Sequence, residues 1–299
     1  MFDTFPVLDC AGRRLALDRP RIMGIVNVTP DSFADGGAHA STTAAVEHAM
    51  KLAGQGADLL DIGGESTRPG ATVVSLQEEL DRVIPVIERL VAATPLPLSI
   101  DTSRPEVMRA AVAAGAGLIN DVMALRRDGA IEAAASLGVP VCLMHMQGEP
   151  GTMQDDPRYD DVVADVHGFL TQRLFACEMA GIERKKLLVD PGFGFGKTLE
   201  HNLRLLRQLS RFVEMGVPVL AGLSRKGMIG SLIGRTLDER IVGSAVAALI
   251  AVQNGAAIVR VHDVAATVDA LAVWAGVAAQ PGAPARPAKP SMPRWGDED

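Results

Sequence analysis

The polar side chains best suited to chemistry in this chain come directly after short apolar runs. The apolar run at residues 59–62 ends in two glycines, and the next four residues are Glu65, Ser66, Thr67 and Arg68. An ordinary turn needs only one or two polar residues of this kind. The pattern recurs after other apolar runs, where the polar residues are Asn27, Asp101, Asn120, Asp121, Asp190, Ser224, Arg225, Lys226, Arg260 and His262. Any one of them could be structural, but the recurrence predicts one shared site.

The last apolar run, residues 258–262, has the most informative spacing. In a strand, side chains alternate between the two faces, so Arg260 and His262 share one face while Val259 and Val261 share the other. The valines suit a helix layer, which leaves the two basic side chains pointing to the opposite side. Two neighbouring cationic donors favour an anion, and arginine can contact phosphate oxygens through two nitrogens at once. We interpret the pair as an anion site; the alternative is a solvated arginine beside an unrelated histidine.

Asp101 and Asp190 predict the opposite kind of ligand group. Each ends an apolar run, where an ionised carboxylate without a partner is costly. A ligand with adjacent N–H donors would pair them, at about 1.5–3 kcal/mol for each charged hydrogen bond. The edge of a fused heterocycle fits this description, and Asn120 could both donate to it and accept from it. Asp61 and Asp121 are explained equally well as structural carboxylates.

The glycine-rich segment at residues 191–198 resembles a phosphate-binding P-loop only superficially. The position five residues before Gly196 is Pro191, whereas the P-loop requires a glycine there. We interpret the glycines as allowing the backbone to pass close to a flat ligand, with Phe195 as one wall of its site.

Eight apolar runs can form buried strands that place these residues at one edge. They lie at 22–27, 58–62, 97–101, 118–121, 140–144, 187–190, 218–222 and 258–262. Continuous apolar runs are typical of parallel strands covered on both faces. Helices are predicted between them at 43–56, 76–93, 105–114, 129–137, 160–181, 199–209, 238–254 and 263–275.

This alternation predicts an α/β fold, a (β/α)₈ TIM barrel, with a doubly wound sheet as the alternative. In such a barrel the active site lies at the carboxyl ends of the strands. Residues 1–21 are predicted to form a short hairpin that closes the bottom of the barrel, and residues 22–276 form the barrel itself. Residues 277–299, in which prolines recur at every third position from 281 to 293, are expected to be a disordered tail.

The composition excludes several classes of protein. A net charge of −7 over 299 residues argues against nucleic-acid binding, which needs a basic surface. The three cysteines, Cys10, Cys142 and Cys177, are widely separated and suit reduced thiols in the cytoplasm. No apolar run approaches the roughly 20 residues of a membrane span, and the first residues do not form a signal peptide. We therefore expect a cytoplasmic protein that binds neither nucleic acid nor a membrane.

Taken together and in this order, seven stretches resemble the dihydropteroate synthases, the pterin-binding TIM-barrel family of the folate pathway that sulfonamides inhibit. The resemblance covers roughly residues 20–275. The stretches are 24–33 (GIVNVTPDSF), 61–70 (DIGGESTRPG), 99–103 (SIDTS), 119–122 (INDV), 190–197 (DPGFGFGK), 222–226 (GLSRK) and 260–263 (RVHD). Each alone is suggestive, and the ordered set is highly specific.

The resemblance implies a reaction and a set of partners. Family members join para-aminobenzoate to (7,8-dihydropterin-6-yl)methyl diphosphate and release 7,8-dihydropteroate and pyrophosphate. The implied mechanism is early loss of pyrophosphate, assisted by Mg²⁺, followed by attack of the amine. Family members usually form homodimers, and the small-molecule substrates are the partners expected here.

The resemblance also implies a role for individual residues. Pterin binding is assigned to Asp101, Asn120, Asp190, Phe195 and Lys226. Diphosphate binding is assigned to Asn27, Thr67, Arg260 and His262, with Asn27 also holding Mg²⁺. The para-aminobenzoate site is assigned to Phe33, Arg68, Pro69, Ser224 and Lys226. Catalysis is assigned to Asp31, Arg68, Asp101, Arg260 and His262. The two long loops that follow residues 27 and 62 are expected to close over the site, with Glu65 as a possible brace.

Two alternatives remain open on sequence grounds. Pterin-binding domains of corrinoid methyltransferases are similar barrels, but they need no diphosphate pocket. The pair Arg260 and His262, the stretch 224–226 and the loop at 29–33 all argue against that reading. The second alternative is a non-catalytic paralogue that binds a pterin or a partner without turnover.

Overall fold

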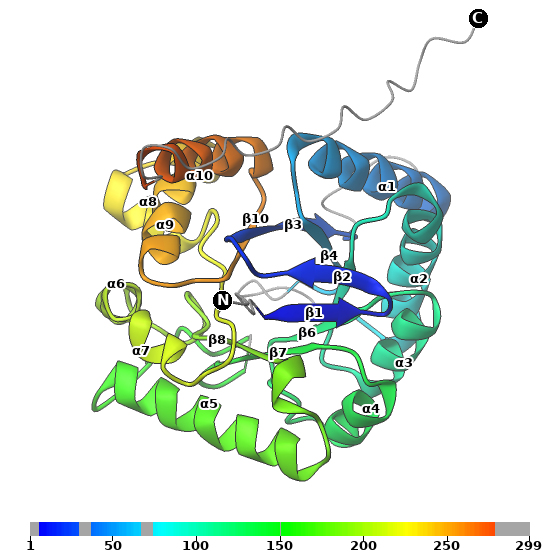
Figure 1. The fold of residues 1–299 in the computed structure, drawn as a ribbon, viewed down its shortest axis with the longest axis horizontal. Coiled ribbons are helices and arrows are strands. Elements are labelled where there is room, and N and C mark those ends of the chain that lie inside the picture. Colours follow the sequence, from blue (N-terminus) through cyan, green and yellow to red (C-terminus); the bar gives the residue numbers. More distant parts are fainter. Residues whose placement is uncertain (1–5, 30–36, 67–73, 150, 279–299) are drawn as a thin grey trace, which may run out of the picture.

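The computed structural model describes residues 6–29, 37–66, 74–149 and 151–278, and it shows the predicted barrel. Its parallel strands follow the order β8-β7-β6-β5-β4-β3-β10-β9, and a bridge between Val189 and Val219 joins the two ends (Figure 1). The bounds are β3 Arg21–Asn27, β4 Leu59–Gly63, β5 Leu98–Asp101, β6 Leu118–Asp121, β7 Val141–Met144, β8 Leu187–Asp190, β9 Leu220–Ala221 and β10 Ile258–Val261. All eight predicted strands are confirmed. Strand β9 is shorter than predicted, and Pro218, which precedes it, has no N–H to donate to a ladder.

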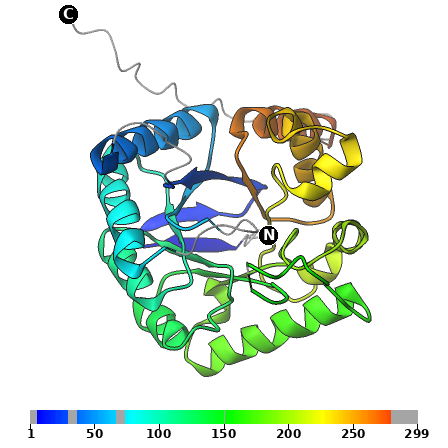
Figure 2. The same cartoon turned by 180° about the vertical axis from the view of Figure 1, so that it is seen from behind.

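Helices surround the strands in both face-on views (Figure 1 and Figure 2). Their bounds are α1 Gly37–Gln55, α2 Leu76–Ala93, α3 Pro105–Ala113, α4 Ala130–Leu137, α5 Val162–Met179, α6 Leu199–Arg207, α7 Ser210–Val213, α8 Gly227–Ile233, α9 Ile241–Gln253 and α10 Val264–Ala278, with short 3₁₀ turns at Arg184–Lys186 and Leu237–Arg240. Helix α8 was not predicted. It has only seven residues, two of them glycine, so its apolar periodicity is too short to recognise. None of the described helices is long and apolar enough to cross a membrane.

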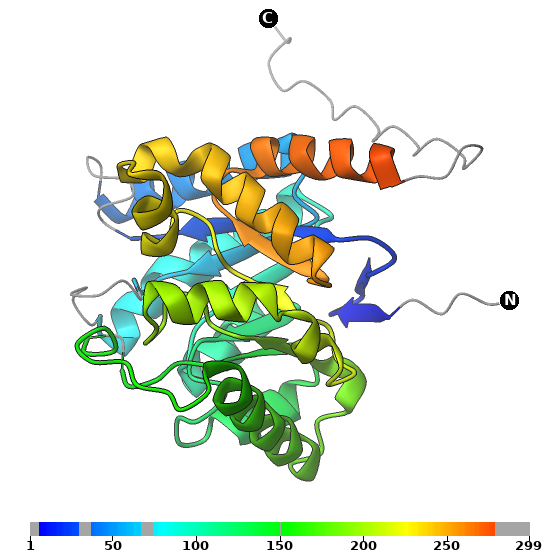
Figure 3. The same cartoon turned by 90° about the vertical axis from the view of Figure 1, so that its left-hand side faces the viewer.

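The N-terminal hairpin closes the amino-terminal end of the barrel, as predicted (Figure 3). Strands β1 Val7–Cys10 and β2 Arg13–Ala16 pair antiparallel. Leu8, Cys10 and Leu15 are buried against the lowest interior layer of the barrel. A Cβ atom on Gly117 would lie 2.3 Å from the backbone carbonyl carbon of Cys10, so only glycine allows the hairpin to approach this closely.

Strand alternation brings the polar residues to the barrel interior. Val259 and Val261 belong to the core between strands and helices, while Ile258 belongs to the core inside the barrel. Arg260 therefore points inward, as the spacing predicted. The strand register then places Asp61 beside Ser99. The carboxyl ends of neighbouring strands thus carry their polar side chains at the same height.

Candidate active site

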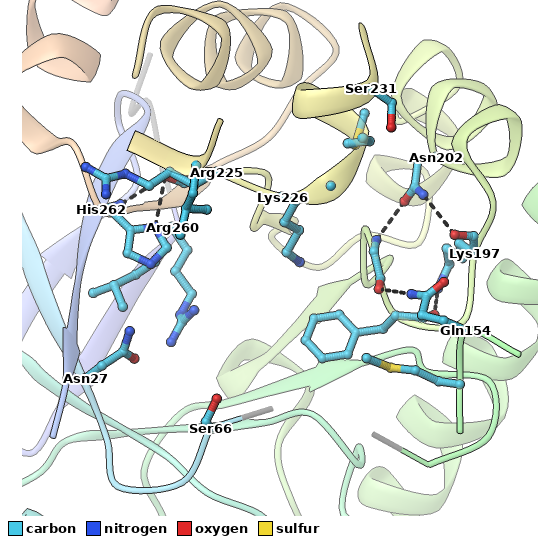
Figure 4. A pocket seen from close by; sticks show the side chains of 18 of the residues that line it. Asn27, Ser66, Gln154, Lys197, Asn202, Arg225, Lys226, Ser231, Arg260 and His262 are labelled. Atoms are coloured by element: carbon cyan, nitrogen blue, oxygen red, sulfur yellow. Dashed lines mark hydrogen bonds between the residues drawn. The ribbon is translucent and has the colours of Figure 1, made fainter. Parts of the chain in front are cut away.

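A cavity of about 850 Å³ opens at the carboxyl ends of the strands (Figure 4). Nine residues assigned from the sequence fall within the described part of the chain, and seven of them line this cavity. The seven are Asn27, Asp101, Phe195, Ser224, Lys226, Arg260 and His262. Asn120 and Asp190 are buried near it rather than in its lining. Asp31, Phe33, Thr67, Arg68 and Pro69 lie outside the described residues.

The centre of the site is an arginine held between two carboxylates. Arg260 Nε donates to Asp61 Oδ2 at 2.6 Å, and Arg260 Nη2 donates to Asp101 Oδ2 at 2.7 Å. Asn120 Nδ2 also donates to Asp61 Oδ2, at 3.1 Å. Burial raises the pKa of Asp101 to about 7, although Arg260 acts to lower it. Burial acts to lower the pKa of Arg260, but the two carboxylates outweigh it and raise the pKa above its usual value.

A second cluster of charged side chains, Asp190 and Lys226, lies around Gly222. A Cβ atom there would lie 3.7 Å from Asp190 Oδ2 and 3.8 Å from Lys226 Nζ, so glycine leaves space between the carboxylate and the ammonium group. The Lys226 ammonium group lies 4.5 Å from the centre of the Phe195 ring and donates to the Phe193 carbonyl. Burial lowers the pKa of Lys226 to about 8, although Asp190 acts to raise it. A flat cation or an N–H-rich heterocycle could be bound between the carboxylate and the aromatic wall.

His262 is held by Ser224, which lies in the turn that follows β9. Its backbone N–H donates to Ser224 Oγ at 3.1 Å, and its ring Nδ1 lies 3.1 Å from the same oxygen. Arg225, which lies between Ser224 and Lys226 and also lines the cavity, forms a two-point ion pair with Asp263, at 2.9 and 2.6 Å. The basic residues of the stretch 224–226 therefore have separate roles: Lys226 reaches the cavity centre while Arg225 braces its rim.

The glycines of residues 191–198 pack against protein backbone, which the sequence interpretation did not anticipate. Gly192 and Gly196 have positive φ angles of 70° and 62°. A Cβ atom on Gly192 would lie 1.8 Å from the His145 carbonyl oxygen, and one on Gly196 would lie 2.5 Å from the Gln147 carbonyl oxygen. The glycines are therefore needed because two loops touch each other. Phe195 lines the cavity.

Lys197 and His145 form a buried pair that the sequence did not predict to be close. Lys197 is only 3 % exposed, and its ammonium group contacts His145 Nδ1 at 2.9 Å and donates to the Phe195 carbonyl at 3.0 Å. Burial and the neighbouring ammonium group lower the pKa of His145 to about 2, so its ring stays neutral. The pair ties the loop after β7 to the loop that carries Phe195.

Glu65 braces the segment on which it lies. Its carboxylate accepts a hydrogen bond from the Val74 backbone N–H at 3.3 Å and lies 3.6 Å from Arg104 Nη2. Arg104 Nη2 also donates to the Val74 carbonyl at 2.6 Å, and its Nη1 lies 3.0 Å from the buried carboxylate of Glu79. The described residues on either side of 67–73 are thus held together. The sequence could suggest that Glu65 braces its loop, but not that its partners are Val74 and Arg104, because the latter lies far away in the sequence.

The two carboxylates that looked structural differ in the folded protein. Asp121 accepts from the backbone N–H groups of Met123 and Leu125, both at 2.7 Å, and from Ser103 Oγ. It therefore shapes the chain after β6. Asp61 instead contacts two residues assigned to ligand binding. The signal for this was its position in the interior of an apolar strand, two residues before the glycines.

Comparisons with known proteins identify one family. A family model described as "Pterin binding enzyme" matches residues 23–262. Dihydropteroate synthase of Escherichia coli (strain K12) is 53 % identical over 262 residues, which cover 88 % of this chain and 93 % of the relative. A Xanthomonas albilineans dihydropteroate synthase solved with 4-aminobenzoic acid is 66 % identical with a TM-score of 0.89, covering 93 % of this chain and 100 % of that chain. A structure from the same organism with 7,8-dihydropteroate is 63 % identical, with a TM-score of 0.85 and coverages of 92 % and 100 %.

The chain therefore belongs to the family of pterin binding enzymes. Within that family it belongs with the dihydropteroate synthases, a group of transferases that it matches over most of its length.

Proposed function

We propose that this chain condenses para-aminobenzoate with (7,8-dihydropterin-6-yl)methyl diphosphate to give 7,8-dihydropteroate and pyrophosphate. The observation that carries the proposal is the arrangement of charges in one cavity. Carboxylates suited to the N–H groups of a pterin lie beside Arg260 and His262, which suit a diphosphate. Relatives solved with 4-aminobenzoic acid and with 7,8-dihydropteroate support the same substrates.

The reaction we propose begins when the bond between the pterin methylene carbon and the diphosphate oxygen breaks. The electron pair leaves with the diphosphate, and hydrogen bonds from Arg260 and His262 stabilise the growing negative charge. The carboxylate of Asp101 stabilises the pterin cation that remains. The amine of para-aminobenzoate then attacks the methylene carbon and gives up a proton to solvent. Positioning of the two substrates accounts for the rest of the rate, and no protein nucleophile is required.

We propose Mg²⁺ as the metal and Asn27 as its protein ligand. Asn27 lies at the end of β3 in the cavity lining, and its side-chain amide makes no hydrogen bond to the described residues. The described residues contain no group of three or more His, Cys, Asp or Glu side chains that could hold a metal. Mg²⁺ characteristically takes few protein ligands and uses substrate phosphates for others. When bound, the ion would supply positive charge to the diphosphate.

We propose a homodimer, supported by an apolar surface on three neighbouring helices. Val242, Val246 and Ile250 repeat every four residues along α9, and they are 74 %, 49 % and 38 % exposed. Further exposed apolar residues on the adjoining segments are Leu232, Ile233, Leu237, Ile241, Val273 and Val277. Apolar surface of this extent is characteristic of an interface. We also propose a cytoplasmic location, which the three free, buried cysteines support.

The substitution Val242→Lys is expected to weaken the dimer at least about tenfold, because it would bury an unpaired charge in the interface. The measurement is the dissociation constant from sedimentation equilibrium. Met179→Lys is a matched control, since Met179 is 73 % exposed but lies on α5, which α6 and α7 separate from α9 (Figure 1). Equal dissociation constants for the two variants would place the interface elsewhere.

The proposed function is tested by pyrophosphate release from the purified protein. Release should require the pterin diphosphate, and 7,8-dihydropteroate should form only when para-aminobenzoate is also present. Release should depend on Mg²⁺ and stop when the metal is chelated. If the protein binds the pterin without releasing pyrophosphate, the proposal is wrong and the chain is a binding paralogue. Methyl transfer to a corrinoid would instead favour the methyltransferase alternative.

A further inference from the structure

Asp61 lies beneath the cavity rather than in its wall. Its side chain is 0 % exposed, whereas that of Asp101 on the adjacent strand is 15 % exposed and lines the cavity. Strand alternation explains this position, since Leu60 and Ile62 belong to the helix-facing core and Asp61 points inward between them. Burying a carboxylate is costly unless it is paired. The groups that pair with Asp61 therefore indicate what it does.

One oxygen of Asp61 holds two residues that come from opposite sides of its strand. Oδ2 accepts from Arg260 Nε at 2.6 Å and from Asn120 Nδ2 at 3.1 Å. In the strand order, β10 and β6 each lie two strands away from β4, one on either side. The other oxygen, Oδ1, has no hydrogen-bond partner among the described residues. The carboxylate therefore connects the arginine expected to bind diphosphate with the asparagine expected to bind the pterin.

A ligand in the cavity can replace one of the two hydrogen bonds that Arg260 makes to carboxylates, but not the other. Asp101 lies in the cavity, so a pterin bound there can take over its oxygens and release Arg260 Nη2. Asp61 is out of reach of a ligand in the cavity, so its bond to Nε can persist. A guanidinium group held at Nε still has both terminal nitrogens available for an anion. The bond to Asp61 thus fixes the plane of the group while its outer edge changes partner.

We propose that Asp61 is a positioning residue that orients Arg260 toward the diphosphate and Asn120 toward the pterin. The proposal rests on the proposed function, which supplies the two ligands. It predicts that removing the charge of Asp61 impairs recognition of the pterin diphosphate while leaving that of para-aminobenzoate unchanged. A purely structural carboxylate would affect stability without this selectivity.

The test is Asp61→Asn, which keeps the shape of the side chain and removes its charge. Binding of inorganic pyrophosphate, measured by calorimetry, should weaken about ten- to a hundredfold, as expected for a lost charged hydrogen bond. The KM for the pterin diphosphate should rise by a similar factor, while the KM for para-aminobenzoate should change less than about twofold. Asp121→Asn is the matched control, because Asp121 is also 0 % exposed but, among the described residues, binds only its own loop and Ser103.

Wild-type pyrophosphate affinity in Asp61→Asn would overturn the proposal, as would equal losses in both variants. If Asp61→Asn does not fold, Arg260→Lys is the second variant. Lysine keeps the positive charge but cannot contact Asp61 and a phosphate through separate nitrogens. The variant should therefore bind pyrophosphate more weakly by a similar factor, and an unchanged affinity for pyrophosphate would overturn the proposal. A wild-type protein that releases no pyrophosphate would refute the proposed function. The comparison of pyrophosphate affinities would still decide the role of Asp61.

Discussion

Replacing Arg260 with alanine is expected to reduce the rate of pyrophosphate release by about 10³-fold or more. Arg260 and His262 are the described cavity residues best placed to stabilise a leaving diphosphate, and the loss of one positively charged group of this kind typically costs this much. The measurement is kcat/KM for the pterin diphosphate in the presence of Mg²⁺.

The same substitution should also destabilise the fold. Arg260 is the partner of the buried carboxylate of Asp61 and of the partly buried carboxylate of Asp101. Removing one partner of a buried ion pair typically costs about 3–5 kcal/mol in the free energy of unfolding. From the sequence alone we would expect Arg260→Ala to leave the fold intact, because the alternation within β10 indicates where the side chain points but not what it contacts.

Arg21→Ala separates the two effects. Arg21 lies at the opposite end of the barrel, at the start of β3, where it pairs with Asp18 and Asp58. Its loss should lower the free energy of unfolding while kcat/KM stays near the wild-type value. Wild-type kinetics in a folded Arg260→Ala variant would contradict the assignment of Arg260 to the diphosphate.

The fold could be predicted from the sequence because its signals are local. Eight apolar runs alternate with segments that have the apolar spacing of a helix. In residues 258–262, the alternation of apolar and basic side chains indicates which of them face inward. Helix α8 lacked such a signal because it is short and contains two glycines. The site could be predicted only as a set of strand ends, since parallel strands bring these ends to one edge.

The pairing between those strand ends could not be predicted. Arg260 contacts Asp61 and Asp101, which lie 199 and 159 residues before it. Which inward-facing side chain meets which depends on the strand order and register, and these emerge only when the barrel closes. The same reason explains why Asp61 looked structural from the sequence and why Lys197 was not paired with His145.

Replacing Asp101 with asparagine is expected to slow pyrophosphate release by about 10²–10³-fold, with little change in the fold. Among the described residues, Asp101 is the carboxylate that both lines the cavity and contacts Arg260, so it is placed to stabilise the pterin cation by its charge. Asparagine has nearly the same shape but no charge, and a preorganised charge of this kind typically contributes this much to the rate. Asp58→Asn is the control, because Asp58 is also a buried carboxylate paired with arginine, but its partners Arg19 and Arg21 lie far from the cavity.

The pH dependence of the same variant gives a second, independent result. Burial raises the pKa of Asp101 to about 7, so its carboxylate is charged above that pH and becomes neutral as the pH falls below it. Burial lowers the pKa of Lys226 to about 8, so its ammonium group loses its charge as the pH rises above that value. Because kcat/KM reports on groups of the free enzyme, its profile in the wild type should fall on both sides of a maximum between these values. Asp101→Asn should lose the acid limb and keep the alkaline one, whereas an unchanged acid limb in the variant would show that another group requires deprotonation.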